Sequence, residues 1–477
     1  MDLLIRSPRR IFFGALTVLV GFAAGCASAG SPTPSTEGDP APPSLDAEPI
    51  DRALALATFD SAWSRINSSY YDPDFRGLDW AGVRDELRPA ASVVETRGEL
   101  RILLRDMLSR LGESHFALFP EESVDRIAID DESESEGDAG AGEGDLGLEV
   151  RWVGSQLTVF RIDDGAAYDA GVRPGWIVEA IGTREMSAWT DVIAEAESES
   201  ARVALETQTV SGAASLFGGA VGTLVTVRVR DGREASHTFD LDRRPVRGEM
   251  VQFGQLPALA AHLDFERIPT GAGCVGVIEF NIWMIPLVAS FNRAVDAVAD
   301  CDGIVIDLRG NRGGVGGMVM STAGSFFSER ADLGVVKSRA GELRFVAMPR
   351  GVDAEGQLRD AFDGRLAVLI DQLSMSTSEI FAAGLKVTGR ARLFGTTTPG
   401  YALPAMTIRL PNQDVLYHVV SDLTDPEGRR IEGRGVQPDV EIPLDRIDLL
   451  AGRDAALEAA VGWAGGEGSG SSAGRRY

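Results

Sequence analysis

Lysine is almost absent from this chain of 477 residues, because Lys337 and Lys386 are the only two among 46 basic residues. Histidine is also scarce, with four residues, and cysteine occurs three times. The cysteines form no CxxC pair and no cluster with histidine, so the sequence does not support a zinc-type metal site and no cofactor is expected. The scarcity of lysine restricts any mechanism that needs a lysine amine as a base.

Basic residues as a group are outnumbered by acidic ones. The 46 basic residues face 71 acidic ones, which gives a formal net charge of −25. Nucleic-acid binding needs a basic face that displaces counterions from phosphates, so that class of partner is excluded. Hydrophobic residues make up 44% of the chain, which excludes wholesale disorder. The length predicts about two or three domains.

Residues 1–25 have the pattern of an export signal. An arginine-rich start precedes an apolar stretch that is too short for a permanent membrane span. The stretch ends in Ala-Ala-Gly-Cys, which resembles the lipobox of bacterial lipoproteins and implies lipid on Cys26 and a place in the cell envelope. An ordinary secretory signal with a chance cysteine is the alternative. Residues 26–48 predict a flexible tether. Cys274 and Cys301 can pair in an oxidising compartment, which the sequence leaves open.

Helical periodicity begins after the tether. Apolar residues recur three and four positions apart over 59–70 and again over 100–111, so residues 49–120 are predicted to form a small helical domain. The acidic run 130–138 repels itself and cannot bury apolar area. Residues 121–144 are therefore predicted to be a solvated linker, with an interaction tail as the alternative.

A series of short strands follows the acidic run. They read LGLEV, QLTVFRI and GAAYDAGVRPGWIVEAIG, followed by a hairpin with an Asp-Gly turn. This order resembles a bacterial PDZ domain over residues 145–245. The resemblance implies that backbone N–H groups at Gly147 and Leu148 bind a polypeptide C-terminal carboxylate. Residues 190–222 predict an enlarged insertion, and its Gly/Ala-rich part, 211–222, predicts either a mobile lid or a plain loop.

Strands and helices alternate over residues 246–450. CVGVIEF, GIVIDLRG, RLAVLID and ARLFGT are nearly continuous apolar strands, while residues 286–299 and the segment SEIFAAGLKVTG are helix-like. This alternation predicts an α/β domain with a parallel sheet covered on both faces. Residues 451–477 are predicted to form a C-terminal helix and a disordered tail.

Two polar motifs follow predicted strands of this domain. The motif SMSTSE opens a helix, so partial positive charge and free N–H groups surround Ser376 and favour a nucleophile whose oxyanion is stabilised. The alternative is a capping box of Ser376 and Glu379, which needs no catalysis. The second motif, IDLRGNRGG over 306–314, is a glycine-rich turn that lets backbone amides approach a substrate. It lacks the pattern of a phosphate loop.

Together with the closing segment RRIEGRGVQPDVEIPL, these motifs resemble the C-terminal processing (tail-specific) serine peptidases over roughly residues 49–450. The resemblance implies a crotonase-like (ClpP/crotonase) α/β peptidase core with an inserted PDZ domain, and Ser376 as nucleophile. Its oxyanion donors would be the N–H of Thr377 and one N–H from the Gly313-Gly314 turn, with Gly313 as the first choice. Typical members use a lysine base further along the chain, but Tyr401 occupies that position here. Tyr401 would donate a hydrogen bond to substrate or simply pack.

The tricorn core proteases are a second branch and use a Ser–His–Ser–Glu tetrad. The segments LGESHF and RRIEGRGVQPD match that branch at Ser114, His115 and Glu432. This resemblance implies that His115 acts as general base on Ser376, oriented by Ser114 and Glu432. The alternatives are a histidine bonded locally for structure and a Glu432 that pairs with a neighbouring arginine.

These features predict a lipid-anchored, extracytoplasmic serine endopeptidase that cleaves unfolded or C-terminally exposed proteins through Ser376. The expected partners are polypeptides, bound at the PDZ domain through free C-termini, and a membrane bound through lipid on Cys26. The rival is a catalytically inactive, peptidase-like lipoprotein that only binds peptides, a hypothesis that Tyr401 supports. A crotonase-type acyl-CoA enzyme would share the core fold, but export and the PDZ insertion argue against it.

Overall fold

The computed structural model describes residues 45–124, 143–196, 198–252, 254, 258–271 and 273–466. No helix within these residues is long and apolar enough to cross a membrane. The predicted signal, the lipid site at Cys26 and nearly all of the tether lie outside the described residues.

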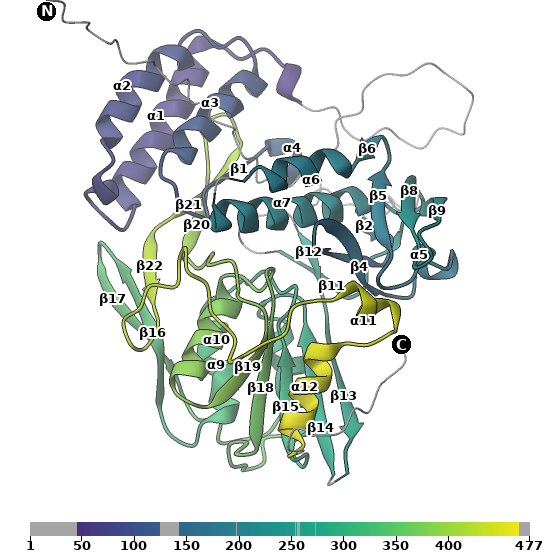
Figure 1. Ribbon diagram of the computed structural model, residues 1–477. Coiled ribbons are helices and arrows are strands. Elements are labelled where there is room, and N and C mark those ends of the chain that lie inside the picture. The colour runs from purple at the N-terminus through teal and green to yellow at the C-terminus, as the bar shows by residue number, and fades with distance from the viewer. Residues whose placement is uncertain are drawn as a thin grey trace, which may run out of the picture.

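Three helices form the N-terminal part: α1 (Arg52–Ser69), α2 (Trp80–Ala91) and α3 (Arg97–Ser109). Each follows a capping side chain that accepts a hydrogen bond from the first turn: Asp51, Asp79 and Thr96. Their apolar faces share a core with four residues from a distant part of the chain: Leu403, Leu410, Leu416 and Val419. In Figure 1 these helices lie at the upper left, directly above β20 and β21.

A three-stranded antiparallel sheet joins the helices to the rest of the molecule. Its order is β1 (Ala117–Phe119), β21 (Val415–Val419) and β20 (Ala405–Arg409). The helices therefore do not pack as an isolated N-terminal unit, because the chain returns some 300 residues later to complete their core. Periodicity within one segment could not show this long-range packing.

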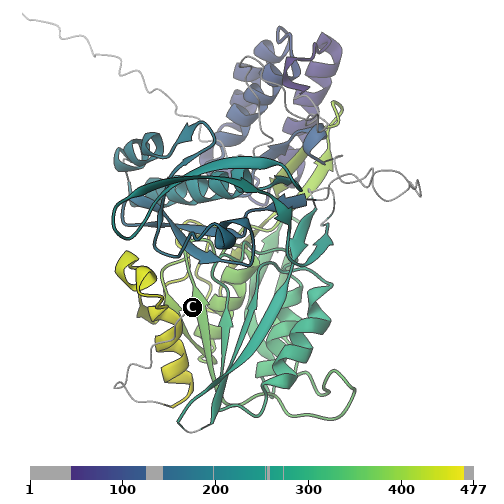
Figure 2. The same cartoon turned by 90° about the vertical axis from the view of Figure 1, so that its right-hand side faces the viewer.

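An inserted unit lies beside the helices and above the core in Figures 1 and 2. Its sheet has the order β3 (Leu148–Val153), β4 (Gln156–Ile162), β5 (Ile177–Ile181), β8 (Leu224–Arg230) and β9 (Ser236–Asp242). The predicted hairpin is present as β8 and β9. Short elements complete the unit: α5 (Ala166–Asp169), β6 (Arg184–Glu185), α6 (Ser187–Ala194), α7 (Glu199–Phe217) and the small sheet β10 (Arg244–Pro245), β2 (Glu143–Asp145), β7 (Gly219–Ala220).

The prediction of a lid or loop over 211–222 is wrong for its first seven residues. Helix α7 continues to Phe217 and lies against β3. Val210, Ala213 and Phe217 are buried in the core of the unit. The small residues between them conceal the helical spacing in the sequence.

At the ends of the predicted linker, α4 (Glu121–Val124) and β2 are regular structure, and residues 125–142 lie outside the described part.

The core sheet has six strands in the order β13 (Leu263–Pro269), β14 (Cys274–Phe280), β15 (Gly303–Asp307), β18 (Arg365–Ile370), β19 (Ala391–Gly395) and β23 (Val440–Glu441). All neighbours from β14 to β23 are parallel, and only β13 is antiparallel. The predicted α/β fold with a parallel sheet is confirmed. The disulfide Cys274–Cys301, with Cα atoms 4.8 Å apart, closes the connection from β14 to β15.

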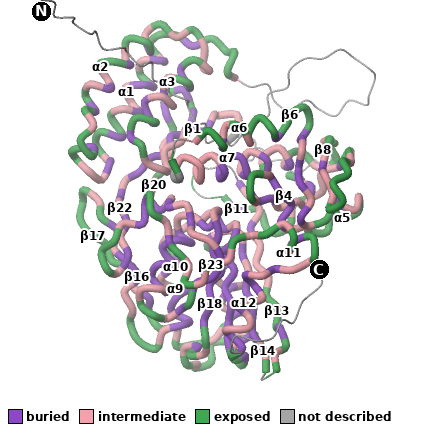
Figure 3. Tube along the Cα trace, in the orientation of Figure 1, coloured by how far each residue is buried: buried purple, intermediate pink, exposed green. Residues whose placement is uncertain are grey.

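Helices cover both faces of the core sheet, as Figure 2 shows. The helices on one face are α8 (Leu287–Ala297), α9 (Met318–Ala323) and α10 (Thr377–Val387), and the helix on the other is α12 (Ala455–Ala464). Ile304 and Ile306 pack on the first face, whereas Val305 packs on the second. This alternation explains the continuous apolar strands, and Figure 3 shows the central strands as mostly buried.

The remaining elements lie at the edges of the core. One small sheet has the order β17 (Gly341–Ala347), β16 (Ala331–Ser338) and β22 (Ser421–Thr424), and another pairs β11 (Glu249–Val251) with β12 (Leu259–Ala261). After β23, the short helix α11 (Arg446–Leu450) contacts the inserted unit through Arg446, which donates to the carbonyls of Gly175 and Asp231.

Candidate active site

Ser376 lies in a strained turn directly before α10. Its φ is 54° and its ψ is −114°, values that residues with a side chain rarely adopt. Two acceptors hold its N–H, the carbonyl of Tyr401 at 2.7 Å and Glu379 Oε2 at 3.0 Å. The capping box of Ser376 and Glu379 is present. The capping and nucleophile interpretations are therefore compatible, and the strain is of the kind that clusters at functional sites.

The glycine-rich turn packs directly against this serine. A methyl group on Gly313 would lie 2.6 Å from Cβ of Ser376 and 3.0 Å from the nitrogen of Thr377. The N–H of Gly313 donates to Asn311 Oδ1 at 3.0 Å, so the predicted oxyanion role of Gly313 needs correction. Gly314 is exposed, and across the described chain neither its N–H nor that of Thr377 has an acceptor. These two N–H groups are available to an oxyanion.

Ser114, His115 and Glu432 form a continuous hydrogen-bonded relay. Glu432 Oε1 accepts the Ser114 N–H at 2.9 Å, and Glu432 Oε2 accepts the Ser114 hydroxyl at 3.0 Å. The Ser114 Oγ lies 2.6 Å from His115 Nδ1. Because the single hydroxyl proton goes to the carboxylate, Oγ must accept from Nδ1–H, which leaves Nε2 unprotonated. That tautomer is the one a general base requires.

Burial sets the charge states in the relay. It lowers the pKa of His115 to about 4, because the charged imidazolium is poorly solvated. The ring also lies against Tyr417, with centroids 5.7 Å apart. Burial raises the pKa of Glu432, while hydrogen bonds from Ala402 and Ser114 oppose that rise. His115 is therefore uncharged at neutral pH.

Residues 401 and 402 join the nucleophile to the relay. The Tyr401 carbonyl accepts the Ser376 N–H, and the next N–H, that of Ala402, donates to Glu432 Oε2 at 2.8 Å. No hydrogen bond in the described structure links Ser376 to His115. Such bonds are often long until substrate is bound. Burial raises the pKa of Tyr401 to about 12, so its phenol stays protonated, and the choice between donating and packing stays open.

Both lysines are engaged away from this site. Lys386 Nζ donates to the Gln437 carbonyl at 2.7 Å and pairs with Asp439 at 3.1 Å. Lys337 pairs with Glu342 at 3.2 Å. Among the described residues, neither ammonium forms a hydrogen bond or ion pair with the Ser376 turn.

Glu113 fixes the segment that carries the relay, and this role is not apparent from the sequence. Its buried carboxylate accepts hydrogen bonds from two tyrosines and two arginines: Tyr70, Tyr71, Arg76 and Arg430. Arg430, one of the two arginines near Glu432 in the sequence, binds Glu113 and Asp422 instead of Glu432. The position of Glu113 immediately before Ser114-His115 is the only hint in the sequence.

The predicted carboxylate-binding loop is partly occupied. The N–H of Gly147 donates to Asp145 Oδ1 at 2.8 Å, and Leu148 begins β3 opposite Ile162. A ligand carboxylate at Gly147 would therefore have to displace an acidic side chain. The sequence pattern does not show this competing Asp145 carboxylate, and binding of a ligand at Gly147 and Leu148 stays a prediction.

The inserted unit contacts the loop that precedes Ser376. Arg151 Nε donates to Asp371 Oδ2 at 2.7 Å, while Asp371 Oδ1 accepts the N–H groups of Gly310 and Leu373. The Leu373 side chain is buried in the core of the inserted unit. The turn before Ser376 and the glycine-rich turn at Gly310 are thus both anchored to β3.

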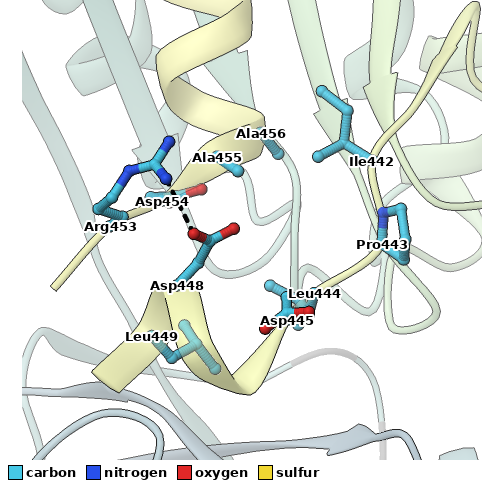
Figure 4. Close-up of a pocket in the computed structure, with 10 residues that line it drawn as sticks. All are labelled: Ile442, Pro443, Leu444, Asp445, Asp448, Leu449, Arg453, Asp454, Ala455 and Ala456. Carbon is cyan, nitrogen blue, oxygen red and sulfur yellow. Dashed lines mark hydrogen bonds and ion pairs between the residues drawn. The ribbon is translucent and has the colours of Figure 1, made fainter. Parts of the chain in front are cut away.

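A cavity of about 10 Å³ lies between β23 and α12, beside the Arg453–Asp448 ion pair (Figure 4). That volume holds about one water. None of its lining residues belongs to the site around Ser376, so it contributes nothing to the chemistry.

The chain is similar in sequence to known peptidases. Residues 274–442 match peptidase family S41, and residues 56–109 match the tricorn protease C1 domain. Tricorn protease homolog 1 of Streptomyces coelicolor is 25% identical over 419 residues, covering 84% of this chain and 34% of that protein. A probable CtpA-like serine protease of Staphylococcus aureus is 30% identical over 181 residues, covering 37% of this chain and 35% of that protein. The chain thus spans about a third of the length of these relatives.

Solved structures share the fold. The photosystem II D1 C-terminal processing protease aligns with a TM-score of 0.54 and 19% identity, covering 87% of this chain and 98% of that one. Mature CPAF aligns with a TM-score of 0.55 and 12% identity, covering 84% and 94%.

Proposed function

We propose that this chain is a member of peptidase family S41 and a serine endopeptidase that transfers acyl groups from polypeptides to Ser376 and then to water. The observation that carries the proposal is the Ser114 hydroxyl held between His115 and Glu432. A histidine oriented through a hydroxyl by a carboxylate is a general base in the correct tautomer.

In the first step, His115 Nε2 accepts the proton of the Ser376 hydroxyl as Oγ attacks the scissile carbonyl carbon. The N–H groups of Thr377 and Gly314 stabilise the oxyanion, each by about 3 kcal/mol. The imidazolium then protonates the leaving amine. Water attacks the acyl-enzyme with His115 again as base, which releases the second product. The proposal requires Nε2 to reach the Ser376 hydroxyl once substrate is bound.

The proposed location is the cell envelope, with lipid on Cys26 and the folded part in the periplasm or outside the cell. The lipobox-like sequence supports the anchor, and the Cys274–Cys301 disulfide is of a kind that persists in oxidising compartments. Cys26→Ser should abolish labelling by a palmitate analogue and release the protein from membranes. Continued labelling of that variant would reject the anchor.

The activity is tested by hydrolysis of casein and labelling by a fluorophosphonate probe. Wild type should hydrolyse casein and take up one probe, and Ser376→Ala should do neither. Ser68→Ala, which removes an exposed hydroxyl in α1, is the control and should behave as wild type. If wild type shows neither hydrolysis nor labelling, the peptide-binding alternative, which Tyr401 in the lysine position favours, replaces this proposal.

A further inference from the structure

We infer that Trp283 is a positioning residue for the oxyanion hole, because it fixes the Gly314 peptide so that its N–H points toward the turn that carries Ser376. The inference rests on the proposed function and deepens it, since it explains how one of the two oxyanion donors is held in place.

The backbone of Trp283 pairs with the glycine-rich turn as a short parallel strand. Its N–H donates to the Gly313 carbonyl at 2.9 Å, and its carbonyl accepts the Val315 N–H at 2.7 Å. In a parallel pairing of this kind, the N–H and C=O of the residue between those two partners, Gly314, point to the opposite edge. A Cβ atom at position 314 would lie 2.2 Å from the Trp283 carbonyl oxygen, so this close pairing requires glycine there.

The opposite edge of Gly314 faces the nucleophile turn. Its carbonyl accepts the hydroxyl of Thr377, the residue directly after Ser376, at 3.0 Å. The Gly314 N–H lies on the same edge and has no acceptor among the described residues. Trp283 and Thr377 therefore hold this peptide from its two edges. An oxyanion donor is effective only when it is aimed in advance at the place where negative charge develops.

The indole ring anchors Trp283 to α10. The ring is fully buried and contacts Phe280 and Phe381, with centroids 4.8 and 5.1 Å away. Its Nε1–H donates to the Ser378 hydroxyl at 2.9 Å. Ser378 Oγ lies 3.0 Å from both the carbonyl oxygen and Oδ1 of Asn311, so its own proton goes to that residue. One buried chain of hydrogen bonds thus joins the glycine-rich turn, the short strand at Trp283 and the helix behind the nucleophile.

The variant Trp283→Phe keeps a ring in the core and removes the indole N–H. We expect kcat to fall about 10- to 100-fold with KM within about threefold of wild type, because alignment of a donor matters most in the transition state. Complete titration of Ser376 with a fluorophosphonate gives the concentration of active enzyme, to which kcat is referred. Ser378→Ala removes the acceptor of the same bond and should act in the same way. The double variant should be no worse, since both changes break one network.

Inhibition by a peptide aldehyde separates alignment from general binding. When Ser376 Oγ adds to the aldehyde carbon and its proton passes to His115, the former carbonyl oxygen occupies the oxyanion position. The inhibition constant should therefore rise by about the factor by which kcat falls. Binding of the corresponding product peptide, which forms no such adduct, should not change.

Trp63→Phe is the matched control, because the Trp63 indole donates to the Trp80 carbonyl at the same distance of 2.9 Å but within the N-terminal helices. It should keep the wild-type kcat and inhibition constant. Hydrogen exchange measured by mass spectrometry adds a readout that needs no turnover. Residues 311–317 should exchange about 10-fold faster in Trp283→Phe and in Ser378→Ala than in wild type, and at the wild-type rate in the control.

The inference is overturned if Trp283→Phe lowers only the number of sites that the probe labels, because that result shows loss of folded protein and not of alignment. Equal weakening of aldehyde and product binding, or unchanged exchange over residues 311–317, would also overturn it. If wild type is active and Trp283→Phe matches it per labelled site, this inference alone fails. If wild type cleaves nothing and takes up no probe, the proposed function itself fails and the oxyanion role falls with it.

Discussion

Glu432 accepts both the backbone N–H and the hydroxyl of Ser114, at 2.9 and 3.0 Å, although the two residues are 318 positions apart in the chain. One comes from the segment that follows the N-terminal helices and the other from the end of the peptidase core. The base of the proposed reaction therefore exists only when these two parts of the molecule are packed together. Mutations in either part can disable catalysis without touching Ser376.

The hydrogen-bonded relay predicts which variants lose the most activity. His115→Ala should lower kcat/KM about as far as Ser376→Ala does, and the double variant should be no worse, since members of a catalytic unit are not additive. Glu432→Gln should cost less, because it orients the base through Ser114 and transfers no proton itself. Peptide hydrolysis by the four proteins measures this. Retention of most activity by His115→Ala would show that another group is the base.

The acid limb of the pH–rate profile should have its midpoint at a lower pH than an ordinary histidine would give. The base must be unprotonated, so kcat/KM rises with pH through the pKa of His115 in the free enzyme. Burial lowers that pKa to about 4, from about 6.5 in water. Activity should therefore be flat across pH 6 to 7 and decline only toward about pH 4. His237→Gln, which removes a half-buried histidine of the inserted unit, should leave the limb in place. A midpoint near 6.5 would contradict the burial argument.

Tyr401→Phe separates the two roles left open for this side chain. If Tyr401 only packs, the variant should keep kcat/KM within about twofold, because the ring remains and only a hydroxyl is lost. If its phenol, protonated below a pKa of about 12, donates to substrate, the variant should lose about 10-fold. In either case it should retain substantial activity, unlike loss of a base. Loss comparable to that of Ser376→Ala would assign the phenol to the chemistry itself.

The Cys274–Cys301 disulfide should stabilise the core without being needed for chemistry. It closes a loop of 27 residues between two strands of the central sheet. Chain-entropy arguments give about 3 kcal/mol for a loop of this size. Replacing both cysteines with serine should lower the denaturation midpoint accordingly, while fluorophosphonate labelling of Ser376 persists at low temperature. An unchanged midpoint would mean that the bond does not form in the isolated protein.

The sequence allowed the local features of this molecule to be predicted and missed those that depend on distant partners. The apolar strands around Val305 and the helix that begins after Ser376 follow from periodicity and turn chemistry within single segments. Packing of Leu416 and Val419 into the helical core depends on residues some 300 positions away, which no local pattern contains. Helix α7 was missed because small residues hide its apolar stripe.

The same distinction applies to the site. Ser114, His115 and Glu432 were predicted from motifs and are joined by hydrogen bonds in the structure. Within the predicted Gly313-Gly314 turn the free N–H is that of Gly314, since the side chain of Asn311 binds the N–H of Gly313. Which of two adjacent amides is free depends on one side-chain rotamer, and spacing alone cannot determine that.

The variant Glu113→Gln tests whether the Glu113 carboxylate holds His115 in position. His115 has a φ of 61°, a left-handed conformation that a residue with a side chain adopts only when its surroundings enforce it. The strand pairing of β1 with β21 holds the chain after His115, and the Glu113 carboxylate, bound by two tyrosines and two arginines, holds it before. Glu113→Gln keeps the size of the side chain but removes the charge that these donors share. We expect kcat to fall about 10- to 100-fold with little change in KM, since the base is displaced while the peptide-binding surface remains.

Glu122→Gln is the control for Glu113→Gln. Its carboxylate is also nearly buried, with 8% of the side chain exposed against 4% for Glu113, and it also binds an arginine, Arg101. Glu122 makes no contact with Ser114, His115 or Glu432 within the described residues. Both variants should lower the free energy of unfolding, by about 1–3 kcal/mol, but only Glu113→Gln should lower kcat when both are assayed well below their melting temperatures. Equal effects of the two variants on kcat would show that Glu113 acts through general stability and not by positioning His115.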